Sequence, residues 1–474
     1  MDFDKDLAAR QEARLLCRQA KTAQGILATF PQEKLNQIVE AVAAAFSAAA
    51  AELAELAVAE TGFGNKTDKT VKNKFAAETV AEAIRNQTCV GILNRDEKKK
   101  LWEIGVPVGV IAAIVPSTNP TSTICYKALI ALKSGNTIVF SPHPKALECS
   151  LRAAKIVAAA AEKAGAPAGS VGCLSLASMA GCQELMGAPE VALILATGGP
   201  AMVRSAYSSG KPAIGVGAGN GPAFIHHSAN IRQALEHILQ SKNFDYGTIC
   251  ASEQSIIVDK RTADEVRRTA QGMGYYFMSD GEAEKMARIL FRPNGALNPE
   301  IVGRPAVKLA EMAGFPVPGD TKILVAREEK AGPTRPYSME KLCPVLAFYV
   351  MENEDAVLAK VVEVLNHEGA GHTFSIHCED EAVIRKFALS VPVSRFLVNT
   401  PSALGGIGST TGLFPALTLG CGAVGGSSSS NNIGPMDLVN IRRVAWGQET
   451  APKRPKVDDD LVELLAAKIL ERLK

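Results

Sequence analysis

The spacing of apolar residues predicts a helical amino-terminal region followed by strands and helices in alternation. From Leu7 to Ile84 the apolar positions recur at helical intervals among Ala, Glu and Lys, with a break at residues 61–65. Beyond it, strands and helices are predicted in turn at 108–115, 122–134, 137–140, 146–164, 171–176 and 193–196. This alternation is typical of a parallel sheet that is covered by helices.

A second alternation begins after Cys250 and predicts a second α/β domain from about residue 219. Its strands and helices are expected at 255–258, 263–271, 347–350 and 354–365. A charged segment between two apolar runs predicts a hairpin-like excursion at 90–104, and residues 437–445 predict a late strand. The expected division is a first domain of residues 1–87 and 105–218, a second of 219–424, and a small β element of 88–104 and 425–448.

Composition places the chain among ordinary globular proteins of two or three domains. Of its 474 residues, 47% are hydrophobic and 21% charged, and the net charge of +2 gives no support for nucleic acid or an anionic membrane as a partner. The acidic opening, Met1 to Asp6, is unlike a signal peptide, and glutamates interrupt the Ala-rich run at 41–60. No metal site is predicted. The ten cysteines show no Cys-x-x-Cys pair, which favours a reduced, cytoplasmic environment in which most thiols are small buried hydrophobes.

Two short segments carry the candidate chemistry. Cys250 closely follows Gly247 and precedes an apolar run, where a turn can present a thiol to a cleft. Asn119 lies in a Pro-Ser-Thr-Asn-Pro segment after an apolar strand, which gives a fixed amide donor. A thiolate and an amide donor are the minimum apparatus for attack on a carbonyl group and stabilisation of the resulting oxyanion.

Two glycine-rich stretches invite a dinucleotide-binding interpretation, which their local context does not support. Residues 420–425 match G-x-G-x-x-G, but a glycine and four serines follow where a helix should begin. Residues 215–221 lack the third glycine in register. On local grounds both stretches are predicted to be loops.

The cysteine and asparagine segments resemble those of the aldehyde dehydrogenase superfamily, and more narrowly its coenzyme A-acylating branch. The resemblance covers residues 7–447 and is carried also by Ser141-Pro142-His143-Pro144, Thr197-Gly198-Gly199-Pro200, Met339 to Pro344, Gly371-His372-Thr373 and Leu419 to Gly422. The chain is similar as well to the aldehyde dehydrogenase half of bifunctional aldehyde–alcohol dehydrogenases. Because it ends at Lys474, an iron-dependent alcohol dehydrogenase half is expected not to be encoded. The resemblance implies an α/β fold with two Rossmann-like domains and a small oligomerisation β element.

The resemblance also implies a cofactor and a site. NAD is expected to bind at the residues that match the family's: Pro116, Ser117, Thr118, Ser141, His143, Thr197, Gly198, Gly199, Gly217 and Glu340. Without the resemblance, Glu340 would be read as a solvated loop carboxylate. Cys250 is expected to attack an aldehyde while the Asn119 amide and the Cys250 backbone N–H hold the oxyanion. Hydride transfer to NAD would leave an acyl-thioester on Cys250.

The segment that carries the general base in hydrolytic relatives differs in this chain. Those relatives have Glu-Leu-Gly-Gly-Lys, and here the stretch from Val216 to Asn220 places valine where the glutamate would be. Without that base, attack by water should slow by roughly 10²–10⁴-fold, whereas a thiol needs less help. Coenzyme A is therefore the expected acyl acceptor. His372 is the candidate for proton transfer to or from its thiol, with a hydrogen-bonded structural histidine as the alternative.

Alternative functions are a hydrolytic aldehyde dehydrogenase, an acyl-phosphate reductase of the same fold, and a non-catalytic NAD-binding scaffold. The resemblance implies a short aldehyde such as acetaldehyde or propionaldehyde. Tyr246 and Ala201 depart from the Asn and Gly common in relatives, which affects the expected shape of the substrate pocket. The β element implies a homodimer or homotetramer.

The carboxyl-terminal tail predicts a linker and a separate helix. Two prolines stiffen residues 449–456, and residues 457–474 have an apolar face with acidic residues at the start and basic ones near the end. The helix either packs on its own or a sister subunit, or resembles the encapsulation peptides that carry aldehyde-processing enzymes into bacterial microcompartments. The second interpretation implies a shell protein as partner and a location inside the compartment.

Overall fold

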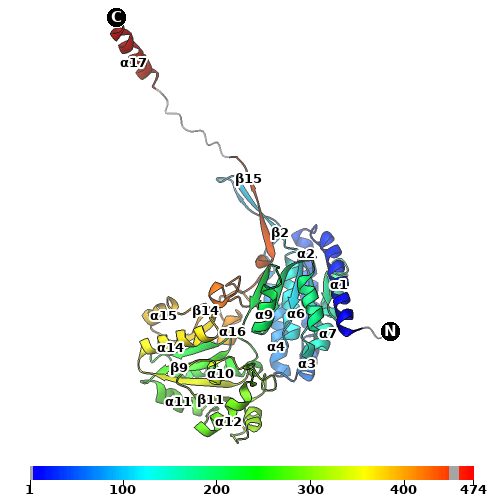
Figure 1. Ribbon diagram of the computed structural model, residues 1–474, viewed down its shortest axis with the longest axis vertical. Helices are drawn as coiled ribbons and strands as arrows, with labels where there is room; N and C mark the ends of the chain where they lie inside the picture. Colours follow the sequence, from blue (N-terminus) through cyan, green and yellow to red (C-terminus); the bar gives the residue numbers. More distant parts are fainter. Residues whose placement is uncertain (1–3, 448–457) are drawn as a thin grey trace.

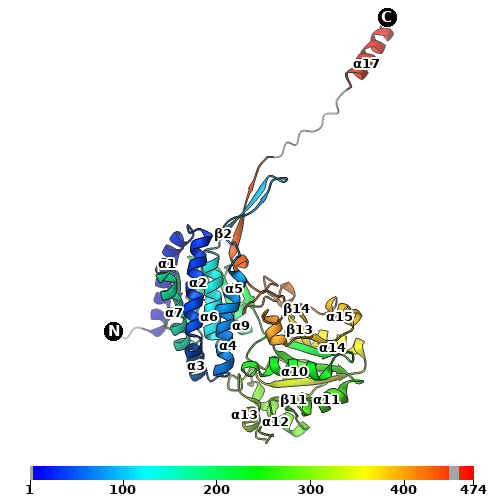
Figure 2. The ribbon, with the colours of Figure 1, turned by 180° about the vertical axis from the view of Figure 1, so that it is seen from behind.

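The computed structural model describes residues 4–447 and 458–474. Figures 1 and 2 show two α/β regions side by side, with a narrow antiparallel ribbon that projects from their junction. The predicted linker and Val457 lie outside the described residues. The predicted α/β fold class is confirmed, because two separate sheets consist of parallel strands joined through helices.

The amino-terminal region is helical, as predicted, and comprises α1 (Lys5–Leu27), α2 (Gln32–Ala48), α3 (Ala50–Thr61), α4 (Lys66–Lys74) and α5 (Val80–Ile84), with a π-helical turn at Phe75–Thr79. The predicted break is present. Gly62 ends α3 in the left-handed conformation, and the Asn65 side chain accepts a hydrogen bond from the backbone of Asp68 to begin α4.

The first sheet has the strand order of a dinucleotide-binding fold. Its five parallel strands, in the order β5-β4-β3-β6-β7, are β3 (Val110–Ile114), β4 (Thr137–Ser141), β5 (Val171–Cys173), β6 (Val191–Thr197) and β7 (Ala213–Val216). The strand order switches at β3: β4 and β5 follow on one side of it, and β6 and β7 on the other. Ligands bind at this switch point, between β3 and β6, in such folds. The helices that cover the sheet are α1, α6 (Pro120–Lys133), α7 (Leu147–Lys163), α8 (Met179–Gly187) and α9 (Pro200–Tyr207).

The second sheet is also fully parallel, in the order β10-β11-β12-β9-β8-β13-β14. Its strands are β8 (Gly221–Ile225), β9 (Glu253–Asp259), β10 (Tyr275–Phe277), β11 (Ile323–Arg327), β12 (Val345–Met351), β13 (Gly371–His377) and β14 (Val393–Val398). Its helices are α10 (Ile231–Asn243), α11 (Ala263–Gln271), α12 (Asp280–Leu290), α13 (Ala306–Ala313), α14 (Glu354–His367), α15 (Glu381–Ala388) and α16 (Ser402–Gly406).

The predicted hairpin and late strand form a third, antiparallel sheet. Its strands β1 (Gly91–Asp96), β2 (Leu101–Pro107) and β15 (Val439–Ala445) pair in the order β1-β2-β15. The sheet projects from the body (Figure 1). Ile92 on β1 is 43% exposed, and Trp446, directly after β15, is 45% exposed. A tail helix, α17 (Asp459–Arg472), has no buried residue.

Two local predictions need correction. The predicted strand at 171–176 stops at Cys173, because the Ser175 and Leu176 backbone N–H groups donate to the Glu12 carboxylate instead of to a strand. The glycine-rich stretch 215–221 is not a loop throughout. Its ends belong to β7 and β8, and only residues 217–220 form the connection.

In the part of the chain that the structure describes, no single helix is long and apolar enough to cross a membrane. The helices α2 and α3 pass by length and composition when taken as one pair bent by 61°. Residues on both helices are buried against the protein core.

Candidate active site

A cavity of about 290 Å³ lies between the two parallel sheets. The loops that follow β3, β4, β6 and β7 of the first sheet meet the segments that precede β8, β9 and β12 of the second. The carboxyl edge of one sheet therefore faces the amino edge of the other across the cavity. The carboxyl edge is the one at which a doubly wound sheet binds its ligands.

Most of the residues that the sequence nominated line this one cavity: Pro116, Ser117, Thr118, Asn119, His143, Thr197, Gly198, Gly199, Gly217, Cys250 and Glu340. Two nominated residues do not. Ser141 is the last residue of β4 and is buried behind the cavity wall. His372 is fully buried at the start of β13 and reaches the cavity only through its contact with Cys250.

Cys250 and His372 form a thiol–imidazole pair. Nε2 of His372 lies 3.2 Å from Sγ of Cys250, and Nδ1 lies 2.8 Å from Oγ1 of Thr373. Burial, with a smaller effect from Arg395, lowers the pKa of His372 to about 3, so the imidazole is neutral near pH 7. A neutral ring whose Nδ1–H donates to Thr373 can accept the thiol proton at Nε2.

The thiol itself is held in its protonated form in the free protein. Burial raises the pKa of Cys250 to about 12, and the nearby Glu340 carboxylate adds to this effect. A thiolate is the reactive form, so the thiol needs a proton acceptor within reach. His372 is the imidazole at that position.

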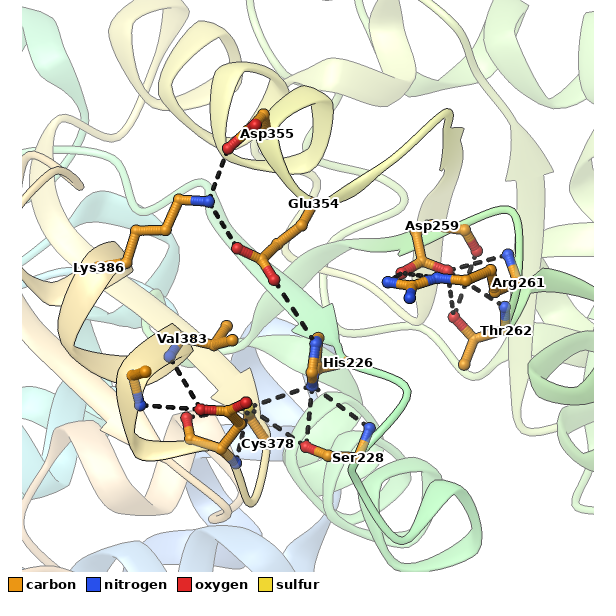
Figure 3. A network of polar contacts seen from close by, with 12 residues as sticks. His226, Ser228, Asp259, Arg261, Thr262, Glu354, Asp355, Cys378, Val383 and Lys386 are labelled. Carbon is orange, nitrogen blue, oxygen red and sulfur yellow. Dashed lines mark hydrogen bonds and ion pairs between the residues drawn. The ribbon is translucent and has the colours of Figure 1, made fainter.

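A second thiol–imidazole pair shows what a structural contact of this kind looks like (Figure 3). Sγ of Cys378 lies 3.4 Å from Nδ1 of His226, and Glu354 lies 3.7 Å from the other ring nitrogen. Both side chains are buried, at the carboxyl ends of β13 and β8, and neither lines the cavity. At about 3.3 Å per residue, β13 separates the two pairs by roughly 20 Å. Only Cys250 is therefore placed to meet a ligand.

Val216 occupies the position of the base in hydrolytic relatives, and no carboxylate from the described residues replaces it. This side chain is buried at the end of β7 and lines the cavity. Among the described residues that line the cavity, Glu340 carries the only carboxyl group, and its Oε1 accepts the Gly219 backbone N–H at 2.9 Å. Burial and the neighbouring Glu368 raise the pKa of Glu340 to about 8, so near pH 7 it is mostly protonated and is a poor acceptor for a water proton.

Several groups along the carboxyl edge of the first sheet suit the phosphates and riboses of a dinucleotide. Oγ1 of Thr197 is buried and has no hydrogen-bond partner among the described residues. A Cβ atom added at Gly199 or Gly217 would meet open space, so the backbone there is accessible to a ligand. Nδ1 of His143 accepts the Lys145 backbone N–H at 3.1 Å, which leaves the Nε2–H free to donate. The residues present therefore fit NAD.

The family of the chain follows from comparison with known proteins. Residues 5–273, more than half of the chain, match the family model described as "Aldehyde dehydrogenase family". The chain belongs to this family. The family expected from the sequence motifs is thereby confirmed.

This aldehyde dehydrogenase family member matches known proteins over more than nine tenths of its length. It is 43% identical over 439 residues to the bifunctional aldehyde-alcohol dehydrogenase of Escherichia coli, a match that covers 92% of this chain and 49% of that protein. The chain thus spans about half the length of that relative. An acetylating aldehyde dehydrogenase from Geobacillus thermoglucosidasius has a TM-score of 0.93 and 48% identity, with 95% of this chain and 100% of that chain covered.

Two propionaldehyde dehydrogenases have the same fold at lower identity. One, from the fucose utilisation microcompartment of Clostridium phytofermentans, has a TM-score of 0.84 and 27% identity over 92% of this chain and 97% of its own. The other, from Rhodopseudomonas palustris, was solved with bound CoA and an acylated cysteine. Its TM-score is 0.83 and its identity 26%, with 92% of this chain and 97% of that chain covered.

Sequence reasoning assigned no role to a buried polar group beside Asn119. Lys72 on α4 contacts Asn119, Asp245 and Thr248, and Lys69 one turn earlier contacts Asp245 as well. Two lysines at this spacing on one helix face would repel each other unless a carboxylate lay between them. The spacing of the two lysines therefore indicates that a carboxylate lies nearby. It does not identify that carboxylate, because Asp245 is more than 170 residues away in the chain.

Proposed function

We propose that this chain is an NAD-dependent, CoA-acylating aldehyde dehydrogenase that converts a short-chain aldehyde into its acyl-CoA through Cys250, reversibly. The observation that carries the proposal is a cavity thiol paired with a neutral imidazole at 3.2 Å, where the wall presents valine in place of a base for water. The acetylating enzyme of Geobacillus thermoglucosidasius and the CoA-bound propionaldehyde dehydrogenase support it.

The first half-reaction follows from the geometry at the thiol. Nε2 of His372 accepts the Cys250 proton as Sγ adds to the aldehyde carbon. The resulting oxyanion is held by Nδ2 of Asn119 and the backbone N–H of Cys250. Bound NAD supplies a hydride acceptor, and the product left on the protein is an acyl-thioester at Cys250.

The second half-reaction transfers the acyl group to a thiol. Once the first proton has passed from Nε2 of His372 to solvent, the CoA thiol gives its proton to Nε2 and attacks the thioester carbon. Sγ of Cys250 then leaves and takes that proton back from Nε2. Water competes poorly, because Val216 offers no base and Glu340 is mostly protonated near pH 7. The same groups serve the reverse reaction, from acyl-CoA to aldehyde.

We assign the nominated residues to the pyrophosphate, the adenosine ribose and the nicotinamide end of NAD. Pro116, Ser117 and Thr118 follow β3, and Thr197, Gly198 and Gly199 lead into α9, whose amino end suits the pyrophosphate. We assign the Nε2–H of His143, together with Ser141, to the adenosine ribose. Glu340 and Gly217 are assigned to the nicotinamide end, beside Cys250.

An apolar wall indicates the class of aldehyde. Ile249, Ile407, Leu417 and Leu419 line the cavity together with the thiol. A short alkyl chain fits such a wall, whereas a carboxylate on the aldehyde would lose hydration without a free cation to bind. Acetaldehyde and propionaldehyde are the proposed substrates.

The test is a comparison of acceptors. Steady-state NADH formation from two- to four-carbon aldehydes, measured with CoA, without any acceptor, and with inorganic phosphate, separates the three reactions of this fold. A strong dependence on CoA is expected. Equal rates without CoA would indicate a hydrolytic enzyme, and dependence on phosphate an acyl-phosphate reductase.

The third sheet is proposed as the subunit-pairing element of a homodimer or homotetramer. The projecting ribbon exposes the apolar side chain of Ile92, with Trp446 exposed just beyond β15, so a second subunit is the cover that we propose for them. With this assignment, residues 1–87 and 105–218 form the NAD-binding domain, 219–424 the catalytic domain, and 88–104 with 425–448 the oligomerisation element.

The tail helix α17 is proposed to dock on a microcompartment shell protein, which would place a cytoplasmic enzyme inside the compartment. Its apolar side chains are all largely exposed: Leu461, Val462, Leu464, Leu465, Ile469, Leu470 and Leu473. A helix of this length with no partner is marginal in water. Packing on a sister subunit is the alternative.

A further inference from the structure

The oxyanion donor Asn119 is held by a buried lysine from the amino-terminal helices. Nζ of Lys72 lies 2.6 Å from Oδ1 of Asn119, 2.5 Å from Oδ2 of Asp245 and 2.8 Å from Oγ1 of Thr248. An ammonium group has three N–H donors, and each of them has one of these acceptors. Lys72 lines the cavity but therefore has no donor left for a substrate.

This contact decides which end of the Asn119 carboxamide faces the reacting atoms. Since the carbonyl end accepts a hydrogen bond from a cation, the reversed orientation would press an NH₂ group against the ammonium group. In the present orientation Nδ2 makes only long contacts, 3.2 Å to Oγ1 of Thr118 and 3.4 Å to the Thr248 carbonyl oxygen. Such a donor is available to a stronger acceptor, and a negatively charged oxygen is one.

Asp245 anchors the lysine to the turn that leads into the nucleophile. Asp245 and the next residue, Tyr246, have φ angles of 48° and 52°. This left-handed backbone conformation is unfavourable for residues other than glycine. The turn is fixed because the Asp245 carboxylate accepts hydrogen bonds from Lys69, Lys72, the Thr248 hydroxyl and the Asn65 backbone N–H. One buried carboxylate thus sets both the approach to Cys250 and the position of Lys72.

We propose that Lys72 is a positioning residue for the reaction: it fixes the Asn119 carboxamide with Nδ2 directed at the oxygen that becomes negative when Cys250 adds to the aldehyde. The inference rests on the proposed function, in which Asn119 holds that oxygen. A purely structural role is the alternative, in which the ion pair only ties α4 to the turn before Cys250.

A double-mutant cycle between Lys72→Met and Asn119→Ala distinguishes the two roles. Asn119→Ala alone should lower kcat by roughly 10²–10³-fold. Lys72→Met should lower kcat by roughly 10-fold or more with little change in KM for the aldehyde, and should cost less than about 2-fold when Asn119 is already Ala. A structural role predicts the same loss in both backgrounds.

Lys69→Met is the matched control. It removes a buried lysine from the same helix and leaves Lys72 paired with Asp245, just as Lys72→Met leaves Lys69 paired with it. Lys69 donates to the Thr118 carbonyl oxygen and not to the Asn119 side chain, so it does not set which end of the carboxamide faces the cavity, and its effect should be equal in both Asn119 backgrounds. If Lys72→Met fails to fold, Lys72→Gln takes its place in the cycle, since its amide keeps two of the three N–H donors and removes the charge.

The outcomes are decisive when the wild-type enzyme is active. Additive losses for Lys72→Met, or the same non-additivity for Lys69→Met, would overturn the inference. A wild-type protein without CoA-dependent aldehyde oxidation would instead overturn the proposed function, before any variant is compared.

Discussion

The thiol sulfur of Cys250 lies 3.2 Å from Nε2 of His372, across 122 residues of sequence. Cys250 lies in the segment before β9, and His372 is the second residue of β13. The fold of the second sheet alone therefore brings the two side chains together. The imidazole is neutral near pH 7 because burial lowers its pKa to about 3, which leaves the Nε2 lone pair open to a hydrogen bond from the thiol.

His372→Ala should lower kcat/KM for CoA-dependent oxidation by roughly 10²–10⁴-fold, the usual contribution of a general base. Steady-state kinetics measure this. His226→Ala is the control, because it removes the other thiol–imidazole contact, far from the cavity. It should lower the melting temperature and leave kcat/KM nearly unchanged. Similar kinetic losses in both variants would argue against proton transfer by His372.

Glu340→Gln should make the Cys250 thiol more acidic. The carboxylate raises the pKa of Cys250, and Glu340 is charged mainly above its own raised pKa of about 8. Removing that charge lowers the thiol pKa, so alkylation of Cys250 by iodoacetamide should be faster in the variant above pH 8. Peptide mass spectrometry follows the site. Glu363→Gln, on α14 and paired with Lys360, should leave the rate as in wild type. An unchanged or slower reaction in Glu340→Gln would refute the coupling.

Val216→Glu should increase the release of free acid relative to acyl-CoA, since it places a potential base beside the thioester. Val216→Gln is the matched control, because it has the same size and no basic group. Both variants need a circular dichroism spectrum like that of wild type, since position 216 is buried. Equal acid release from the two variants, or rapid acid release by the wild-type enzyme, would contradict the role assigned to the missing base.

Deletion of residues 453–474 should leave turnover of the purified enzyme nearly unchanged and release it from the microcompartment. Fusion of the segment to a fluorescent protein should carry that protein inside. In the full-length chain, replacing Leu465 and Ile469 with Glu should reproduce the deletion, because both lie on the exposed apolar face of α17. Loss of turnover on deletion, or a diffuse fusion in cells with assembled compartments, would favour packing on the enzyme itself.

The features that the sequence predicts are those with a distinct local pattern of residues. The alternation of strands and helices follows from apolar spacing, and the segments around Cys250 and Asn119 have distinct local composition. The ends of the glycine-rich stretch 215–221 are strand and not the predicted loop, because burial of β7 and β8 in the sheets overrides the low strand propensity of glycine.

The contacts that orient the site were not predictable in the same way. Lys72 and Asp245 are 173 residues apart, and no pattern near either residue names the other. Their pairing is a product of how α4 packs beside the turn before Cys250. Residues that position a reacting group through a third side chain are for this reason the part of the site that needs the structure.

The most direct measurement is the mass of the Cys250 peptide after incubation with NAD and propionaldehyde. Without CoA, an acyl group should accumulate on Cys250, and addition of CoA should remove it with formation of an equal amount of propionyl-CoA. Cys250→Ala should show no adduct. An unmodified Cys250 in an active enzyme, or an adduct that is lost as free acid before CoA is added, would contradict acyl transfer from this cysteine to CoA.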